Sequence, residues 1–134
     1  MKPLKNYILK LPPYLPTLVV ALAICYLTLV PDPFGDETPQ LFPYADKVAH
    51  FLMFGGFASV IYFDRGRSTG STDMTAVFVA VLLSSIAGGI VEIAQALVVP
   101  GRSGDFPDFI ADCAGAVVCA FAARMVCRKM FGWK

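Results

Sequence analysis

Long apolar runs alternate with short polar segments along this 134-residue chain. A helix needs about 20 apolar residues to cross a bilayer, a length that the third run reaches alone and the others reach with flanking residues. The pattern therefore predicts an all-α, polytopic membrane protein in which four transmembrane helices form an up-down bundle. Residues 1–134 are expected to form one domain, with spans at approximately 15–30, 48–63, 75–99 and 108–126.

The segments between the runs are predicted to be loops. Residues 31–47 are rich in proline and acidic side chains, and residues 64–74 are a polar turn rich in Gly, Ser and Thr. Pro100-Gly101 ends the third run. Within the second run, the pair Gly55-Gly56 would let a neighbouring helix approach closely.

The composition supports a membrane protein. Hydrophobic residues make up 57% of the chain and charged residues only 16%, whereas soluble domains carry about 25% charged residues. With a net charge of +1 and no basic stripe, a nucleic-acid partner is not expected. The basic start of the chain also fits a signal peptide, but no small-residue cleavage site follows, which favours a retained first span.

The basic residues predict the orientation of the bundle. Lys47 and Arg102 fall on one side of the predicted membrane, and every other Lys and Arg lies near a terminus or in residues 64–74. Because cytoplasmic segments carry an excess of Lys and Arg, both termini should be cytoplasmic in a multi-pass protein of the plasma membrane. The other two loops should then face the outside.

This orientation brings polar groups from distant parts of the chain to one depth. Asp46 and His50 are one helical turn apart, as are Asp108 and Asp112. Charges inside a membrane are costly and usually functional. We therefore expect a polar site at the outer end of the bundle. Its candidate residues are Asp46, Lys47, His50, Glu92, Gln95, Arg102, Asp108 and Asp112.

His50 and Glu92 are the candidate catalytic residues. His50 is the only histidine, and a carboxylate could hold its ring in one tautomer for proton transfer. Glu92 would orient the ring. Two structural alternatives remain open: His50 as a hydrogen-bonded residue near a helix end, and Glu92 as the ion-pair partner of Arg102 or Lys47.

The remaining candidates are interpreted as ligand-binding. Arg102 could clamp a phosphate or carboxylate, or it could neutralise the acidic residues around it. Gln95 would supply a supporting hydrogen bond. Asp108 could instead cap the fourth helix. Asp112 lies too deep for capping, and a divalent cation shared by Glu92, Asp108 and Asp112 is a further, weaker alternative.

No metal and no cofactor are predicted. The four cysteines all lie in apolar runs, no Cys-x-x-Cys pair occurs, and a single histidine does not suggest a zinc site. Buried, unreactive thiols are the simpler interpretation.

The ordered polar residues Asp46-Lys47-x-x-His50-Phe51, Glu92-x-x-Gln95, Arg102, Asp108, Asp112 and Gly115 resemble the VanZ-like family over roughly residues 44–127. Asp112 departs from the family pattern, which has Asn there. The resemblance implies a small multi-span membrane protein of the cell envelope. The name-giving member of the family is associated with resistance to the lipid-bearing glycopeptide teicoplanin.

Three functions remain open on the sequence. The first is binding of an anionic or amphiphilic envelope molecule, either a membrane lipid or a lipid-linked or glycopeptide-type ligand. The second is an enzyme that acts on a lipid-linked or phosphorylated envelope substrate with His50 as acid or base. The third is a structural polar network without a ligand. The sequence gives no oligomeric state.

Overall fold

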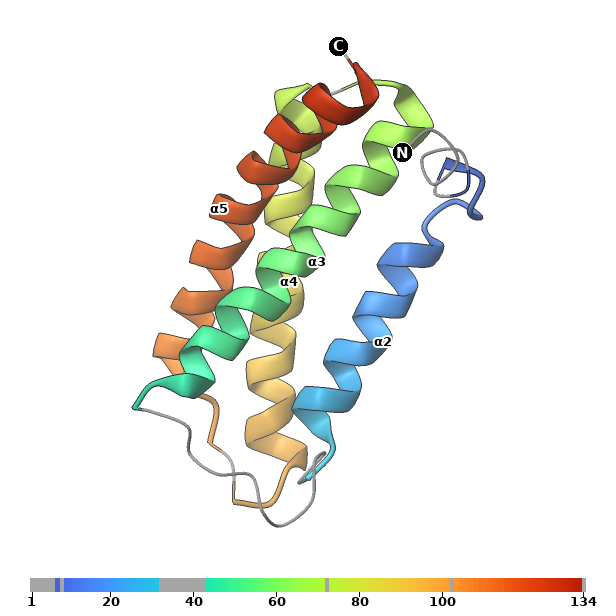
Figure 1. The fold of residues 1–134 in the computed structure, drawn as a ribbon. Helices are drawn as coiled ribbons and strands as arrows, with labels where there is room; N and C mark the ends of the chain where they lie inside the picture. Colours follow the sequence, from blue (N-terminus) through green and yellow to red (C-terminus); the bar gives the residue numbers. More distant parts are fainter. Residues whose placement is uncertain (1–6, 8, 32–42, 72, 102, 134) are drawn as a thin grey trace.

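The protein is described by a computed structural model that places residues 7, 9–31, 43–71, 73–101 and 103–133. Within these residues the chain is all-α, which confirms the predicted fold class (Figure 1). The helices are α2 (Leu15–Leu29), α3 (Ala45–Thr69), α4 (Met74–Val98) and α5 (Phe106–Phe131).

Successive helices run in opposite directions, so the bundle has the predicted up-down order (Figure 1). The most extensive contact is between α3 and α5, and α4 packs against both of them. The shorter helix α2 lies at one side, against α3 and α4. The start of α3, the end of α4 and the start of α5 therefore meet at one end of the bundle.

Local sequence signals set the helix ends. The Asp73 carboxylate accepts a hydrogen bond from the Ala76 backbone N–H at 2.7 Å and caps α4. Gly70, with φ of 66°, ends α3 in the left-handed conformation that glycine adopts without a steric cost. The predicted turn at residues 64–74 is too long, because α3 continues to Thr69.

The α3–α5 contact depends on glycine. A Cβ on Gly55 would lie 3.0 Å from the Gly115 carbonyl oxygen and 2.6 Å from Cys119 Sγ. A Cβ on Gly115 would overlap the backbone of Phe51. Gly56, in contrast, faces open space. Of the predicted glycine pair, Gly55 therefore permits the close approach between helices.

The surface of α4 has the polarity that a lipid environment favours. Its outward face is apolar, and its inward face is small or polar. The exposed residues include Phe78, Leu82, Ile86, Ile90, Ile93 and Leu97, and the buried ones include Ser84, Gly88, Glu92 and Gln95. Among the described helices, α4 and α5 are long and apolar enough to cross a membrane.

Candidate functional site

A buried histidine joins three helices at the end of the bundle where α3 and α5 begin. His50 on α3 is 5% exposed, and its Nδ1 lies 2.9 Å from Oδ1 of Asp112 on α5. The same nitrogen is 3.5 Å from Oε1 of Glu92 on α4. The carboxylate nearest to His50 is therefore that of Asp112, whereas the sequence assigned the orienting role to Glu92. This contact fixes the orientation of the ring.

Lys47 is one turn nearer the start of α3 and holds a second group of carboxylates. Its Nζ lies 2.8 Å from Asp108 Oδ1, 2.9 Å from Asp105 Oδ2 and 3.3 Å from Asp46 Oδ2. Lys47 precedes the predicted span 48–63. Its hydrogen bonds to Asp108 and then Asp105 raise the pKa of its ammonium above the ordinary value, so the side chain stays charged.

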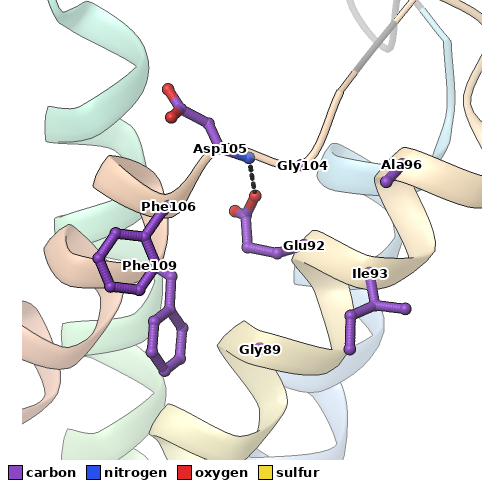
Figure 2. A pocket seen from close by; sticks show the side chains of 8 residues that line it. All are labelled: Gly89, Glu92, Ile93, Ala96, Gly104, Asp105, Phe106 and Phe109. Carbon is purple, nitrogen blue, oxygen red and sulfur yellow. Dashed lines mark hydrogen bonds between the residues drawn. The ribbon is translucent and has the colours of Figure 1, made fainter.

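The start of α5 is fixed against α4 by a backbone contact. The N–H of Asp105 donates to Glu92 Oε2 at 2.8 Å (Figure 2). Gly104 makes this approach possible, because a Cβ at that position would lie 2.8 Å from the Glu92 carbonyl oxygen. Glycine is required here by the proximity of two backbones. The turn thus positions Glu92 at the same time as it positions the first turn of α5.

Two carboxylate oxygens at this end have no hydrogen-bond partner among the described residues. They are Oε1 of Glu92 and Oδ2 of Asp112, and both are buried. Asp112 is fully buried and packs on Gly88, where a Cβ would lie 2.7 Å from its Oδ2. Buried polar atoms in native proteins are usually paired, so an unpaired one needs an explanation.

A groove opens between α4 and α5 beside Glu92, with a volume of about 440 Å³. Its floor and walls are mostly apolar, and Glu92 and Asp105 form its polar end (Figure 2). Phe106 and Ile93 are 71% and 62% exposed, so the groove opens on the outward apolar surface. The lining residues are Gly89, Glu92, Ile93, Ala96, Gly104, Asp105, Phe106 and Phe109.

The structure brings most of the sequence-predicted site together. Asp46, Lys47 and His50 on α3 face Asp108 and Asp112 on α5, and Glu92 completes the group. Their contacts run through the Lys47 and His50 side chains. Among the described residues, Lys47 pairs with aspartates and not with Glu92.

Gln95 stands apart from this group. Gln95 Nε2 donates to the Thr28 carbonyl oxygen at 3.0 Å, so its amide ties α4 to α2. Arg102 lies outside the described residues. The inward stripe of α4 contains Ser84, whose hydroxyl donates to the Phe54 carbonyl oxygen at 2.8 Å.

Helix α5 also begins earlier than expected. Its first residue is Phe106, and Asp105 occupies the N-cap position. Asp108 therefore lies in the first turn, where its charge is favourable to the helix dipole while its carboxylate pairs with Lys47. Asp105 was not among the candidate site residues, although its position three residues before Asp108 places both on one helix face.

A second ionic group, at the opposite end of the bundle, was also missed. Asp64 on α3 is 2% exposed and accepts two hydrogen bonds from Thr17 on α2, from the N–H at 3.1 Å and the hydroxyl at 2.6 Å. Its other oxygen accepts from Arg67 Nη2 at 2.7 Å. Arg67 also donates to the carbonyl oxygens of Leu11 and Pro12. These bonds explain why α3 continues through residues assigned to a turn.

The site offers acid–base and metal-ligating groups in one place. A histidine held by an aspartate can transfer protons to a bound molecule. His50, Glu92 and Asp108 also each offer one ligand atom, and these atoms lie within 4.8 Å of one another. A more exposed set, formed by Asp46, Asp105 and Asp108, meets the same distance criterion.

Comparison with known proteins identifies the family of this chain. No curated protein and no solved structure matches the chain. The family model described as VanZ/LLP1 matches residues 17–127, which include all of α3 and α4 and most of α2 and α5. That family is membrane-associated, in agreement with two helices long and apolar enough to cross a membrane. The chain belongs to the VanZ/LLP1 family, as its resemblance to VanZ-like proteins predicted.

Proposed function

We propose that this protein crosses the cell membrane with all four described helices and binds an amphiphilic envelope molecule at its outer end. The distribution of Lys and Arg supports cytoplasmic termini, and the His50 site lies at the end of the bundle where α5 begins (Figure 1). A reporter fused after Lys134 should therefore be active only in the cytoplasm. Activity outside the cell would contradict this orientation.

The observation that carries the proposal is the groove beside Glu92. An apolar channel that opens on the lipid-facing surface suits a hydrocarbon chain. At its polar end, the Glu92 side chain is 10% exposed, so its carboxylate can accept a hydrogen bond from a ligand that offers a donor.

The head group is best matched by hydroxyl, amide or amine donors. The groove ends at Glu92, whose carboxylate repels an anion. The ammonium of Lys47 already contacts three carboxylates, so it is not free to hold a phosphate. The described residues thus support the amphiphilic alternative over the anionic one. Lipids, lipid-linked sugars and lipid-bearing glycopeptides all have this chemistry.

Native mass spectrometry of the protein purified in mild detergent tests the proposal. Gly89→Leu should fill the groove and remove a co-purifying amphiphile, since a Cβ on Gly89 already contacts Phe109 at 3.4 Å. Gly56→Leu is the matched control, because Gly56 also lies in a helix but faces open space. The control should retain the amphiphile.

Equal retention by both variants would contradict binding in the groove. It would then favour the interpretation of the polar residues as a structural network. Arg102→Ala tests the alternative in which the ligand has an anionic head group. If that variant alone loses the bound molecule, the head group is held by Arg102, and the groove is not the binding site.

The pair formed by His50 and Asp112 favours an enzyme as the second candidate function. A separation of 2.9 Å between Nδ1 and Oδ1 holds the ring so that its other nitrogen can act as acid or base. His50→Gln should then retain the unreacted substrate. A bound molecule of different mass in wild type and variant would indicate turnover, whereas identical masses would contradict catalysis.

A further inference from the structure

We propose that a divalent cation binds at the outer end of the bundle between His50, Glu92 and Asp108. These residues come from α3, α4 and α5, so the ion would join three helices. All three are buried, and their candidate ligand atoms lie within 4.8 Å of one another. The inference is independent of the amphiphile, because it concerns the inner side of Glu92 and not the groove.

The observed distances are close to those between ligands of one metal ion. Zinc lies about 2.0–2.2 Å from nitrogen and carboxylate oxygen ligands, which places neighbouring ligands roughly 3–3.5 Å apart. The separation between His50 Nδ1 and Glu92 Oε1 is 3.5 Å. Asp108 offers an oxygen within 4.8 Å of the other two ligand atoms. Its Oδ1 also accepts a hydrogen bond from Lys47, so the ion would share this carboxylate with the ammonium.

Glu92 provides the independent indication that a ligand is missing. Its side chain is 10% exposed, its Oε2 is held by the Asp105 N–H, and its Oε1 points towards His50 without a hydrogen-bond partner among the described residues. A cation would satisfy this oxygen directly. The anchoring of Oε2 also reduces the entropy lost on binding.

The charge at this end favours a cation. Five carboxylates gather there, and Lys47 and Arg102 are the basic residues that the sequence places beside them. Even two full positive charges leave an excess of negative charge in apolar surroundings, which is costly. The carboxylates are those of Asp46, Glu92, Asp105, Asp108 and Asp112.

The surroundings of His50 suit a metal ligand. Its Nδ1, 3.5 Å from Glu92 Oε1, is the candidate ligand atom, and a cation bound there would replace the proton that this nitrogen shares with Asp112 Oδ1 at 2.9 Å. One nitrogen with two carboxylates favours Zn²⁺ or Mn²⁺ over Mg²⁺ and Ca²⁺, which prefer oxygen alone. The set differs from the alternative considered on the sequence, because His50 replaces Asp112 as a ligand.

Isothermal titration calorimetry tests the site, with Zn²⁺ or Mn²⁺ added to the metal-stripped, full-length protein in detergent. We expect one ion per chain, with Glu92→Gln and His50→Gln each weakening the affinity by more than about 10-fold. Asp46→Asn is the matched control. It removes the same charge as Glu92→Gln at the same end, but from the exposed set, and it should bind like wild type.

Three outcomes would overturn the proposal: no saturable binding, binding that Glu92→Gln and His50→Gln leave unchanged, or binding that only Asp46→Asn abolishes. The last result would place the ion on the exposed aspartates. Circular dichroism and gel filtration of each variant check that a loss is not caused by unfolding. Gly89→Leu should still bind the metal, so failure of the groove proposal and failure of the metal proposal are distinguishable.

Discussion

Two buried carboxylate clusters lie at opposite ends of the bundle and differ in how fully their oxygens are hydrogen-bonded. At one end, Asp64 is almost fully buried, and both oxygens accept hydrogen bonds, from Thr17 and from Arg67. At the other end, Glu92 and Asp112 are also buried, yet each has one oxygen without a partner among the described residues. The carboxylates of both clusters are buried, but among these described residues only Asp64 has hydrogen bonds to both oxygens.

The difference separates a structural cluster from a candidate binding site. A fully paired buried carboxylate holds neighbouring elements in one arrangement, and Asp64 does this for the start of α2 and the end of α3. An unpaired buried oxygen lowers the stability of the fold. A protein tolerates such an oxygen more readily where a ligand or ion pairs with it. The comparison therefore predicts that stability depends mainly on one end and binding mainly on the other.

The largest effect on stability is expected for Asp64→Ala. The change leaves the buried guanidinium of Arg67 without its carboxylate and removes both bonds to Thr17. Loss of one partner from a buried ion pair costs about 3–5 kcal/mol. Unfolding in mixed detergent micelles measures this cost. Thr17→Val, which removes only the hydroxyl bond, should cost about 1 kcal/mol, and equal losses would contradict the assignment.

A smaller effect on stability is expected for Glu92→Gln. The amide keeps an oxygen that can accept from the Asp105 N–H, and it removes a buried charge whose second oxygen is unpaired. We expect the free energy of unfolding to change by less than about 1 kcal/mol, while metal binding is weakened. A loss of stability as large as that of Asp64→Ala would show that both clusters are structural.

The sequence predicted the helices and the end of the bundle at which the site lies. Apolar runs, Pro and Gly mark the helices, and strict up-down order then gives the depth of His50, Glu92 and Asp112. The rotation of a side chain towards one neighbour depends on packing, which periodicity does not encode. Gln95, which bonds to α2, could not be assigned for this reason.

Asp64 shows a second limit of the sequence pattern. It stands among Gly, Ser, Thr and Arg residues, where local composition indicates a turn. Its hydrogen-bond partner Thr17 lies 47 positions away, on another helix. Only the packed bundle brings them together, so the helical state of residues 64–69 follows from tertiary contacts. Local propensity is overridden in this way wherever polar residues have distant partners.

The smallest effect is expected for Lys47, which lies at the more exposed edge of the cluster that contains Glu92 and Asp112. Its three carboxylate partners raise its pKa, so its contribution is complete below the ordinary lysine pKa of about 10.4 and is lost only as pH rises towards the raised value. The difference in melting temperature between wild type and Lys47→Met should therefore be constant from about pH 6 to 9. Lys129→Met removes the same charge from an exposed position on α5 and serves as control. If the difference for Lys47→Met disappears within that range, the ion pairs are too weak to hold α3 against α5.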